Sequence, residues 1–183
     1  FSLSISAKDN YQSCVFLATL LLNSLYQNDV STAEQYIRKL SQLDTGKQFE
    51  YEALLGQAII NAIRGKSEES DEFFTRLATL RLSSKYLVPY WRATIAERKQ
   101  NWSKLIGLVE ILIKLSETEN FREDLPQYYL MLAKGHWGLA NKALALKYAR
   151  MAEAILNEAR PSGDAPLSLS MLETFHSIYR LIA

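Results

Sequence analysis

Very few residues in this chain of 183 residues could carry covalent or metal chemistry. The single cysteine, Cys14, cannot form a disulfide within the chain, so the fold does not depend on an oxidising compartment. Only two histidines are present, and we interpret His136 and His176 as structural or surface residues. The seven glycines are scattered and form no phosphate-binding motif. We therefore expect no metal site, no cofactor and no catalysis, so the chain is not predicted to be an enzyme.

An excess of one charge sign and a long hydrophobic run are also missing. The chain has 21 Lys and Arg against 20 Asp and Glu, a formal net charge of +1, and the two signs balance in each half. A nucleic-acid-binding surface normally shows a concentrated basic excess, so we expect no direct contact with nucleic acid. The most apolar run, from Cys14 to Tyr26, is shorter than the roughly 20 residues that span a bilayer. It predicts a buried helix in a cytoplasmic protein, with no membrane insertion.

The residues that are abundant favour helices. Leu, Ala, Glu, Lys, Gln and Arg dominate, alternating β-branched runs are absent, and apolar residues recur at spacings of three and four, which is the helical period. Short polar or glycine-containing turns divide the chain at regular intervals. They predict nine helices, near residues 8–27, 30–43, 48–64, 67–82, 86–99, 102–117, 123–139, 142–159 and 166–182. Because the linkers are short, consecutive helices are expected to pack antiparallel.

The helices group into pairs that repeat. Frames of 34 residues that begin at Cys14, Tyr51, Tyr86 and Pro126 start 37, 35 and 40 residues apart. Most frames place a small residue at positions 8 and 20, where the two helices of a pair would approach closely. Position 8 holds Leu21, Ala58, Ala93 and Ala133, and position 20 holds Ala33, Ser70, Leu105 and Ala145. Position 16, where the second helix would begin, holds a capping residue in three frames: Asp29, Asn101 and Asn141.

This pattern resembles the tetratricopeptide repeat, and the resemblance implies the fold. We expect an all-α, right-handed superhelix of about four antiparallel hairpins, over residues 14–47, 51–84, 86–118 and 126–159. A helix over residues 166–182 would cap the last hairpin, because a repeat stack must cover its terminal apolar face. All of these belong to one predicted helical-repeat domain over residues 1–183. Another all-helical bundle or solenoid is the alternative.

The resemblance also implies where a partner would bind. In tetratricopeptide arrays the first helices of successive repeats line a concave groove, and in the third and fourth frames this groove would contain aromatic and cationic residues. The predicted partner-binding residues are Tyr90, Trp91, Arg98, Met131, Lys134 and Trp137. Such a groove suits a helix or extended peptide with hydrophobic anchors and some acidic character. The alternative for each residue is packing against the neighbouring repeat.

The function predicted in this way is that of a noncatalytic interaction or scaffold domain for a protein or peptide partner. Two alternatives stay open: an effector-sensing or oligomerisation domain of a bacterial transcription regulator, and a chaperone for secretion subunits. Because the first residue is Phe1, we interpret the sequence as a fragment of a longer protein. The apolar first hairpin is expected to be covered by residues 1–12 or by a second copy of the chain, since bare apolar patches are rare.

Overall fold

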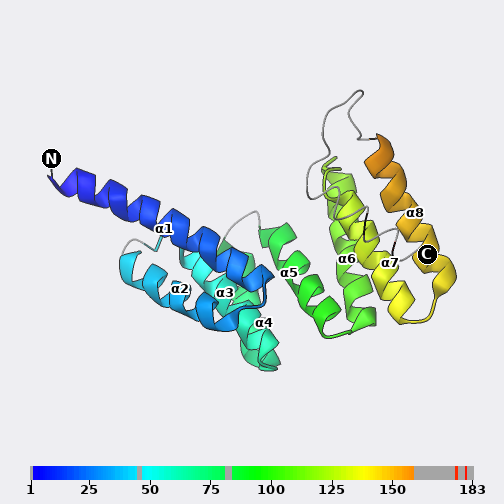
Figure 1. The fold of residues 1–183 in the computed structure, drawn as a ribbon, viewed down its shortest axis with the longest axis horizontal. Helices are drawn as coiled ribbons and strands as arrows, with labels where there is room; N and C mark the ends of the chain where they lie inside the picture. The colour runs from blue at the N-terminus through cyan, green and yellow to red at the C-terminus, as the bar shows by residue number, and fades with distance from the viewer. Residues whose placement is uncertain (1, 45–46, 81–83, 159–175, 177–179, 181–183) are drawn as a thin grey trace. The chain divides into compact units, whose positions relative to one another are not determined.

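The computed structural model of the chain describes residues 2–44, 47–80, 84–158, 176 and 180 (Figure 1). In these residues the regular structure is entirely helical, with no strand. The eight helices are α1 (Ser2–Tyr26), α2 (Val30–Leu43), α3 (Glu50–Ile63), α4 (Ser67–Leu80), α5 (Ser84–Arg98), α6 (Trp102–Thr118), α7 (Leu125–Gly138) and α8 (Lys142–Glu158).

Eight of the predicted helices are thereby confirmed, most of them to within about two residues at each end. The largest difference is at α1, which begins at Ser2 rather than near residue 8. Residues 2–12 therefore prolong α1 along its own axis, as Figure 1 shows. The expectation that residues 1–12 or a second copy of the chain cover the first hairpin stays a prediction. Within this segment the Tyr11 ring contacts Phe49, with ring centroids 5.6 Å apart. The predicted capping helix, 166–182, lies outside the described residues.

The same turn closes all four hairpins. The residue at position 15 of each frame has a positive φ: Asn28 (62°), Gly65 (83°), Gln100 (54°) and Ala140 (59°). In each case the next backbone N–H donates to the carbonyl five residues earlier, at 2.8–2.9 Å, which is the Schellman arrangement that ends a helix. The repeat frame is therefore visible in the backbone as well as in the side chains.

Three of these turns also contain the predicted cap of the following helix. A side-chain oxygen of Asp29 accepts from the backbone N–H of Thr32 at 3.1 Å. Asn101 and Asn141 accept in the same way from residues 104 and 144, both at 3.3 Å. Each cap provides a hydrogen-bond partner for one of the N–H groups that the first turn of a helix leaves unpaired.

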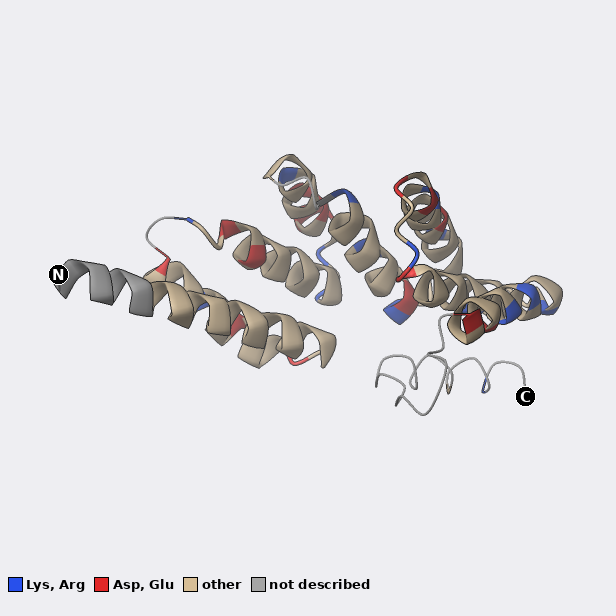
Figure 2. Cartoon of the chain, turned by 90° about the horizontal axis from the view of Figure 1, so that it is seen from above, with Lys and Arg blue, Asp and Glu red and all other residues tan. Residues whose placement is uncertain are grey.

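The chain divides into two compact units, unit 1 (Phe1–Val88) and unit 2 (Pro89–Ala183). In unit 1 the hairpins α1–α2 and α3–α4 each pack tightly, and α3 also contacts α1 and α2. In unit 2 α7 packs between α6 and α8. Lys and Arg are interspersed with Asp and Glu within each unit (Figure 2). The expectation of a single repeat domain stays a prediction.

Small residues bring the helices of a hairpin together. Ala58 at position 8 and Ala33 and Ala145 at position 20 are each 0% exposed, and so is Ala133. In the second hairpin the contact is direct, because the Ser70 hydroxyl donates to the carbonyl oxygen of Ala58 at 2.8 Å. Backbone and side chain can approach this closely only where no bulky group intervenes, which is the packing that the repeat pattern predicts.

Candidate functional site

The candidate site is a surface of unit 2 formed by the first helices of its two hairpins. Lys134 on α7 forms an ion pair with Glu97 on α5, with Nζ and Oε1 2.7 Å apart. Tyr90 lies two turns before Glu97 on the same face of α5, and Arg98 directly follows it. Trp137 lies one turn after Lys134 on α7. We name these five residues the α5–α7 face.

Trp137 is the most prominent apolar group of this face. Its side chain is 49% exposed, although a tryptophan usually buries most of its surface. The ammonium of Lys142, at the start of α8, lies 5.7 Å from the centre of the ring, within the range of a cation–π interaction. An exposed aromatic ring beside a cation is a combination that protein interfaces favour.

The adjacent glycine allows close packing behind this residue. A Cβ atom on Gly138 would overlap the indole of Trp102, which is impossible without movement of the ring or the backbone. The α6 tryptophan therefore packs directly on the α7 backbone. Gly135 has the same relation to Ile106, at 2.8 Å. These contacts hold the end of α7 against α6, and the sequence pattern did not indicate them.

Two of the six predicted contact residues are core residues in the structure. Trp91 and Met131 are each 1% exposed, whereas Arg98 is exposed and Tyr90 and Lys134 are half-buried. Successive helical residues point about 100° apart, so Trp91 turns inward while its neighbour Tyr90 stays partly accessible. The two rings are in edge contact, with centroids 5.9 Å apart. We therefore assign Trp91 and Met131 to packing behind the face, and the other four to the face itself.

A row of stacked aromatic rings joins α7 to α8 beside this face. Tyr148 stacks on Tyr129 (6.2 Å between centroids) and on His136 (5.3 Å). Burial raises the pKa of the Tyr129 phenol, and the charge of Glu117 adds to the rise. The Tyr129 phenol therefore stays protonated at neutral pH. Helical periodicity alone cannot reveal such a row, because it depends on which residues of two helices meet.

The first helix of unit 1 exposes several large apolar side chains to solvent. Its exposed large apolar side chains are Tyr11, Val15, Phe16 and Tyr26. Phe16 is 64% exposed, the highest value among them. Cys14 points the other way: it is buried, and burial raises the pKa of its thiol. A buried, protonated thiol is a poor nucleophile.

Within the described part of the chain, no helix combines the length and the apolar character that crossing a bilayer demands.

Comparison with known proteins identifies one similar fold. No family model matches the sequence, and no curated protein matches it. A solved structure titled "MamA RS-1 ArsTM double mutant" is similar, with a TM-score of 0.50 over 92% of this chain and 94% of that chain. The sequences are 11% identical, so the likeness concerns the fold alone.

The present fold is tetratricopeptide-like. The likeness agrees with the four hairpins, the common turn at position 15 and the close packing at positions 8 and 20. The predicted fold class, an all-α fold of antiparallel helix hairpins, is confirmed for the described residues.

Proposed function

We propose that this chain is a noncatalytic interaction domain that binds a protein or peptide through the α5–α7 face. The observation that carries the proposal is the half-exposed ring of Trp137, one turn from Lys134 and in contact range of Lys142. Aromatic residues and arginine provide much of the binding energy at protein interfaces. Tyr90 and Arg98 add a second aromatic and a further cation.

The face is suited to binding because its helices are held before a partner arrives. The ion pair between Glu97 and Lys134 joins α5 to α7, and the Trp102–Gly138 contact fixes the end of α7. A surface that is already ordered loses little conformational entropy on binding. The partner that fits best presents hydrophobic anchors to Trp137 and acidic groups to Arg98 and Lys142.

The test compares two exposed apolar residues of unit 2. Trp137 (49% exposed) and Ile111 on α6 (50% exposed) are each replaced by alanine, and the partner that co-purifies with the wild-type chain is quantified with both variants. We expect recovery to fall at least about ten-fold for Trp137→Ala, as for an interface hot spot, and to stay unchanged for Ile111→Ala. Equal recovery with the two variants, both folded by circular dichroism, would reject the face.

A second candidate function, self-association, is favoured by the apolar surface of α1. Tyr11, Phe16 and Tyr26 are each more than half exposed, and a second copy of the chain would remove them from water. Light scattering of the wild type and of Phe16→Glu distinguishes the cases, with Ile111→Glu, at an exposed apolar residue of α6, as the control. An oligomer that only Phe16→Glu dissociates would support self-association, and a monomeric wild type would exclude it.

A further inference from the structure

Unit 1 contains a hollow surface that the groove prediction does not include. Two adjoining hollows of about 370 and 320 Å³ lie along α2 and α3, and Gln57 lines both. We name them together the α2–α3 trough. Its length follows α3, whose 14 residues span about 20 Å.

The trough lies on a different side of α3 from the predicted groove. Of the α3 residues, it is lined by Glu50, Ala53, Leu54, Gln57, Ile60, Asn61 and, just beyond the helix, Arg64. None of these occupies a frame position that the repeat resemblance assigns to the concave groove. The second helices α2 and α4 supply the walls, so the trough is a separate candidate site.

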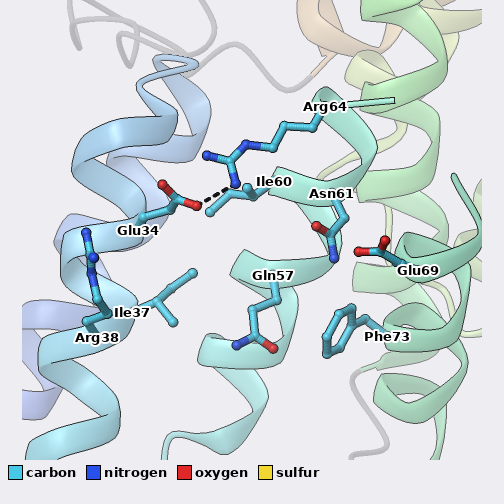
Figure 3. A pocket seen from close by; sticks show the side chains of 9 residues that line it. All are labelled: Glu34, Ile37, Arg38, Gln57, Ile60, Asn61, Arg64, Glu69 and Phe73. Atoms are coloured by element: carbon cyan, nitrogen blue, oxygen red, sulfur yellow. Dashed lines mark ion pairs between the residues drawn. The ribbon is translucent and has the colours of Figure 1, made fainter. Parts of the chain in front are cut away.

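The floor is apolar and the walls are polar. Ile37 and Ile60 are almost fully buried beneath the opening, and Phe73 on α4 is half-buried at its side. Figure 3 shows the side chain of Gln57 projecting from α3 between Arg38 on α2 and Phe73 on α4, and that of Asn61 on the side toward Glu69 and Phe73 of α4. A ligand in this space would meet hydrogen-bonding groups along one helix and a ring on the next.

Outside its ion pairs, the trough carries one more positive charge than negative charges, from Arg38 and Lys47 against Asp44. Each carboxylate that lines it already has a partner: Glu34 pairs with Arg64 at 2.7 Å, Glu69 with Lys66 at 3.1 Å, and Glu50 with Arg76. Asp44 accepts from the backbone N–H groups of residues 48 and 49, at 2.9 and 2.7 Å. Arg38 and Lys47, by contrast, form no ion pair with the residues that the structure describes. The trough is therefore complementary to a ligand with acidic groups.

The spacing of the two amides matches a peptide backbone. Gln57 and Asn61 are one helical turn apart, about 6 Å, and neither side chain has a hydrogen-bond partner among the described residues. Each amide offers both a donor and an acceptor. In an extended peptide, every second residue presents its N–H and C=O to the same side, at intervals of about 6.6 Å. The side-chain amides of Gln57 and Asn61 are therefore spaced to pair with every second peptide group of an extended ligand.

We propose that the α2–α3 trough binds an extended peptide segment of a partner protein that carries acidic side chains. The amides of Gln57 and Asn61 pair with its backbone, Arg38 and Lys47 pair with its carboxylates, and an apolar side chain packs on Phe73 above Ile60. A trough of about 20 Å accommodates about six extended residues. This site is independent of the α5–α7 face.

The probe is a fluorescein-labelled peptide of seven residues in which Val and Glu alternate, titrated against the full chain by fluorescence anisotropy. The matched peptide with Lys in place of Glu tests the charge. We expect the Glu peptide to bind and the Lys peptide not to bind. In nitrogen-edited spectra, the side-chain NH2 signals of Gln57 and Asn61 should shift on addition of the Glu peptide.

Neighbouring cations on α2 provide the control variants. Arg38→Gln should weaken binding about ten-fold, since it removes a charge-assisted hydrogen bond, and Asn61→Leu should weaken it similarly. Lys39→Gln removes the same charge from the adjacent exposed residue, which does not line the trough, and should change the affinity less than about two-fold. Circular dichroism verifies that each variant is folded.

Three outcomes would overturn the proposal. The first is no binding of the Glu peptide at millimolar concentration, and the second is an equal effect of Arg38→Gln and Lys39→Gln. The third is a peptide whose binding depends on Trp137 and not on Arg38, which would place the acidic ligand on the α5–α7 face. Loss of partner recovery by Trp137→Ala, measured separately, does not affect the trough, so the two proposals fail independently.

Discussion

The hydroxyl of Ser70 donates a hydrogen bond to the carbonyl oxygen of Ala58, 2.8 Å away, and so joins α4 to α3 in the interior of unit 1. Ser70 is 4% exposed and Ala58 is 0% exposed. The two residues occupy positions 20 and 8 of the same frame, so the bond joins the two positions at which the repeat pattern places small residues.

The first prediction concerns this bond. Ser70→Ala removes a buried hydrogen bond but leaves the space, and should lower the free energy of unfolding by about 1 kcal/mol. Ser70→Leu must push α4 away from α3 and should cost about 2–3 kcal/mol. Urea unfolding measures both changes. Thr75→Ala, which removes an exposed hydroxyl bond within α4, should change stability by less than about 0.5 kcal/mol. An effect of Thr75→Ala as large as that of Ser70→Leu would contradict this account.

The second prediction compares two helical glycines. Gly107 in α6 has open space where a Cβ would lie, so Gly107→Ala should stabilise the chain by about 0.5–1 kcal/mol through helix propensity. Gly138→Ala meets the Trp102 ring and should instead destabilise by about 1–3 kcal/mol. Thermal unfolding measures whether each variant is more or less stable than the wild type. The double variant Gly138→Ala/Trp102→Ala tests the cause, because removing the ring should make the added methyl group harmless.

The third prediction follows from the buried thiol. Burial raises the pKa of Cys14, and the negative charge of Asp44 adds to the rise. The folded state therefore holds the thiol proton more tightly than the unfolded state does. The resulting stability is fully present below the unfolded pKa of about 8.5 and is lost as pH rises above it.

Two measurements check the state of this thiol. Iodoacetamide at pH 8 should label Cys14 slowly in the native chain and rapidly in urea, since the thiolate is the reactive form. Between pH 8 and 10, the free energy of unfolding should fall less steeply for Cys14→Ala than for the wild type. Rapid labelling of the native chain would show that the thiol is accessible.

The fourth prediction concerns the cap of α2. Hydrogen bonds from the side chain and backbone of Thr32 hold the pKa of Asp29 below its usual range. The corresponding stability is present above the unfolded pKa of about 3.9 and is lost as pH falls through the lower, folded value. Asp29→Asn keeps a capping oxygen but does not titrate, so its stability should fall less between pH 4 and 2. Identical acid-unfolding curves for the two proteins would contradict the role of this carboxylate.

Local chemistry made much of the fold predictable. Asp29, Asn101 and Asn141 were expected to begin second helices, and each accepts the hydrogen bond of an N-cap. These interactions span three residues, so they depend on neighbouring side chains and on little else. The start of α1 was not predicted correctly. Residues 2–7 contain no glycine or proline that would mark a helix boundary, and no strong amphipathic period that would indicate a helix.

The candidate site was predictable only in part. The repeat frame predicted that α5 and α7 contribute to the same surface, and Lys134 and Trp137 are accessible on the α5–α7 face. The same frame nominated Trp91 and Met131, which are buried. A repeat position specifies a direction to within about one residue, and one residue is a rotation of about 100° around a helix. That rotation is the difference between a contact residue and a core residue.

The order of residues along the chain was enough to establish the helices, their turns and their pairing, because hydrophobic period, caps and left-handed turn residues act over a few neighbours. The arrangement in space was needed to establish the Lys134–Glu97 pair, the Trp102–Gly138 contact and the α2–α3 trough. Each of these joins residues from different helices, whose contacts depend on how closely the helices pack and on how each is rotated. No local pattern carries that information, since the rotation is set by the summed packing of many side chains.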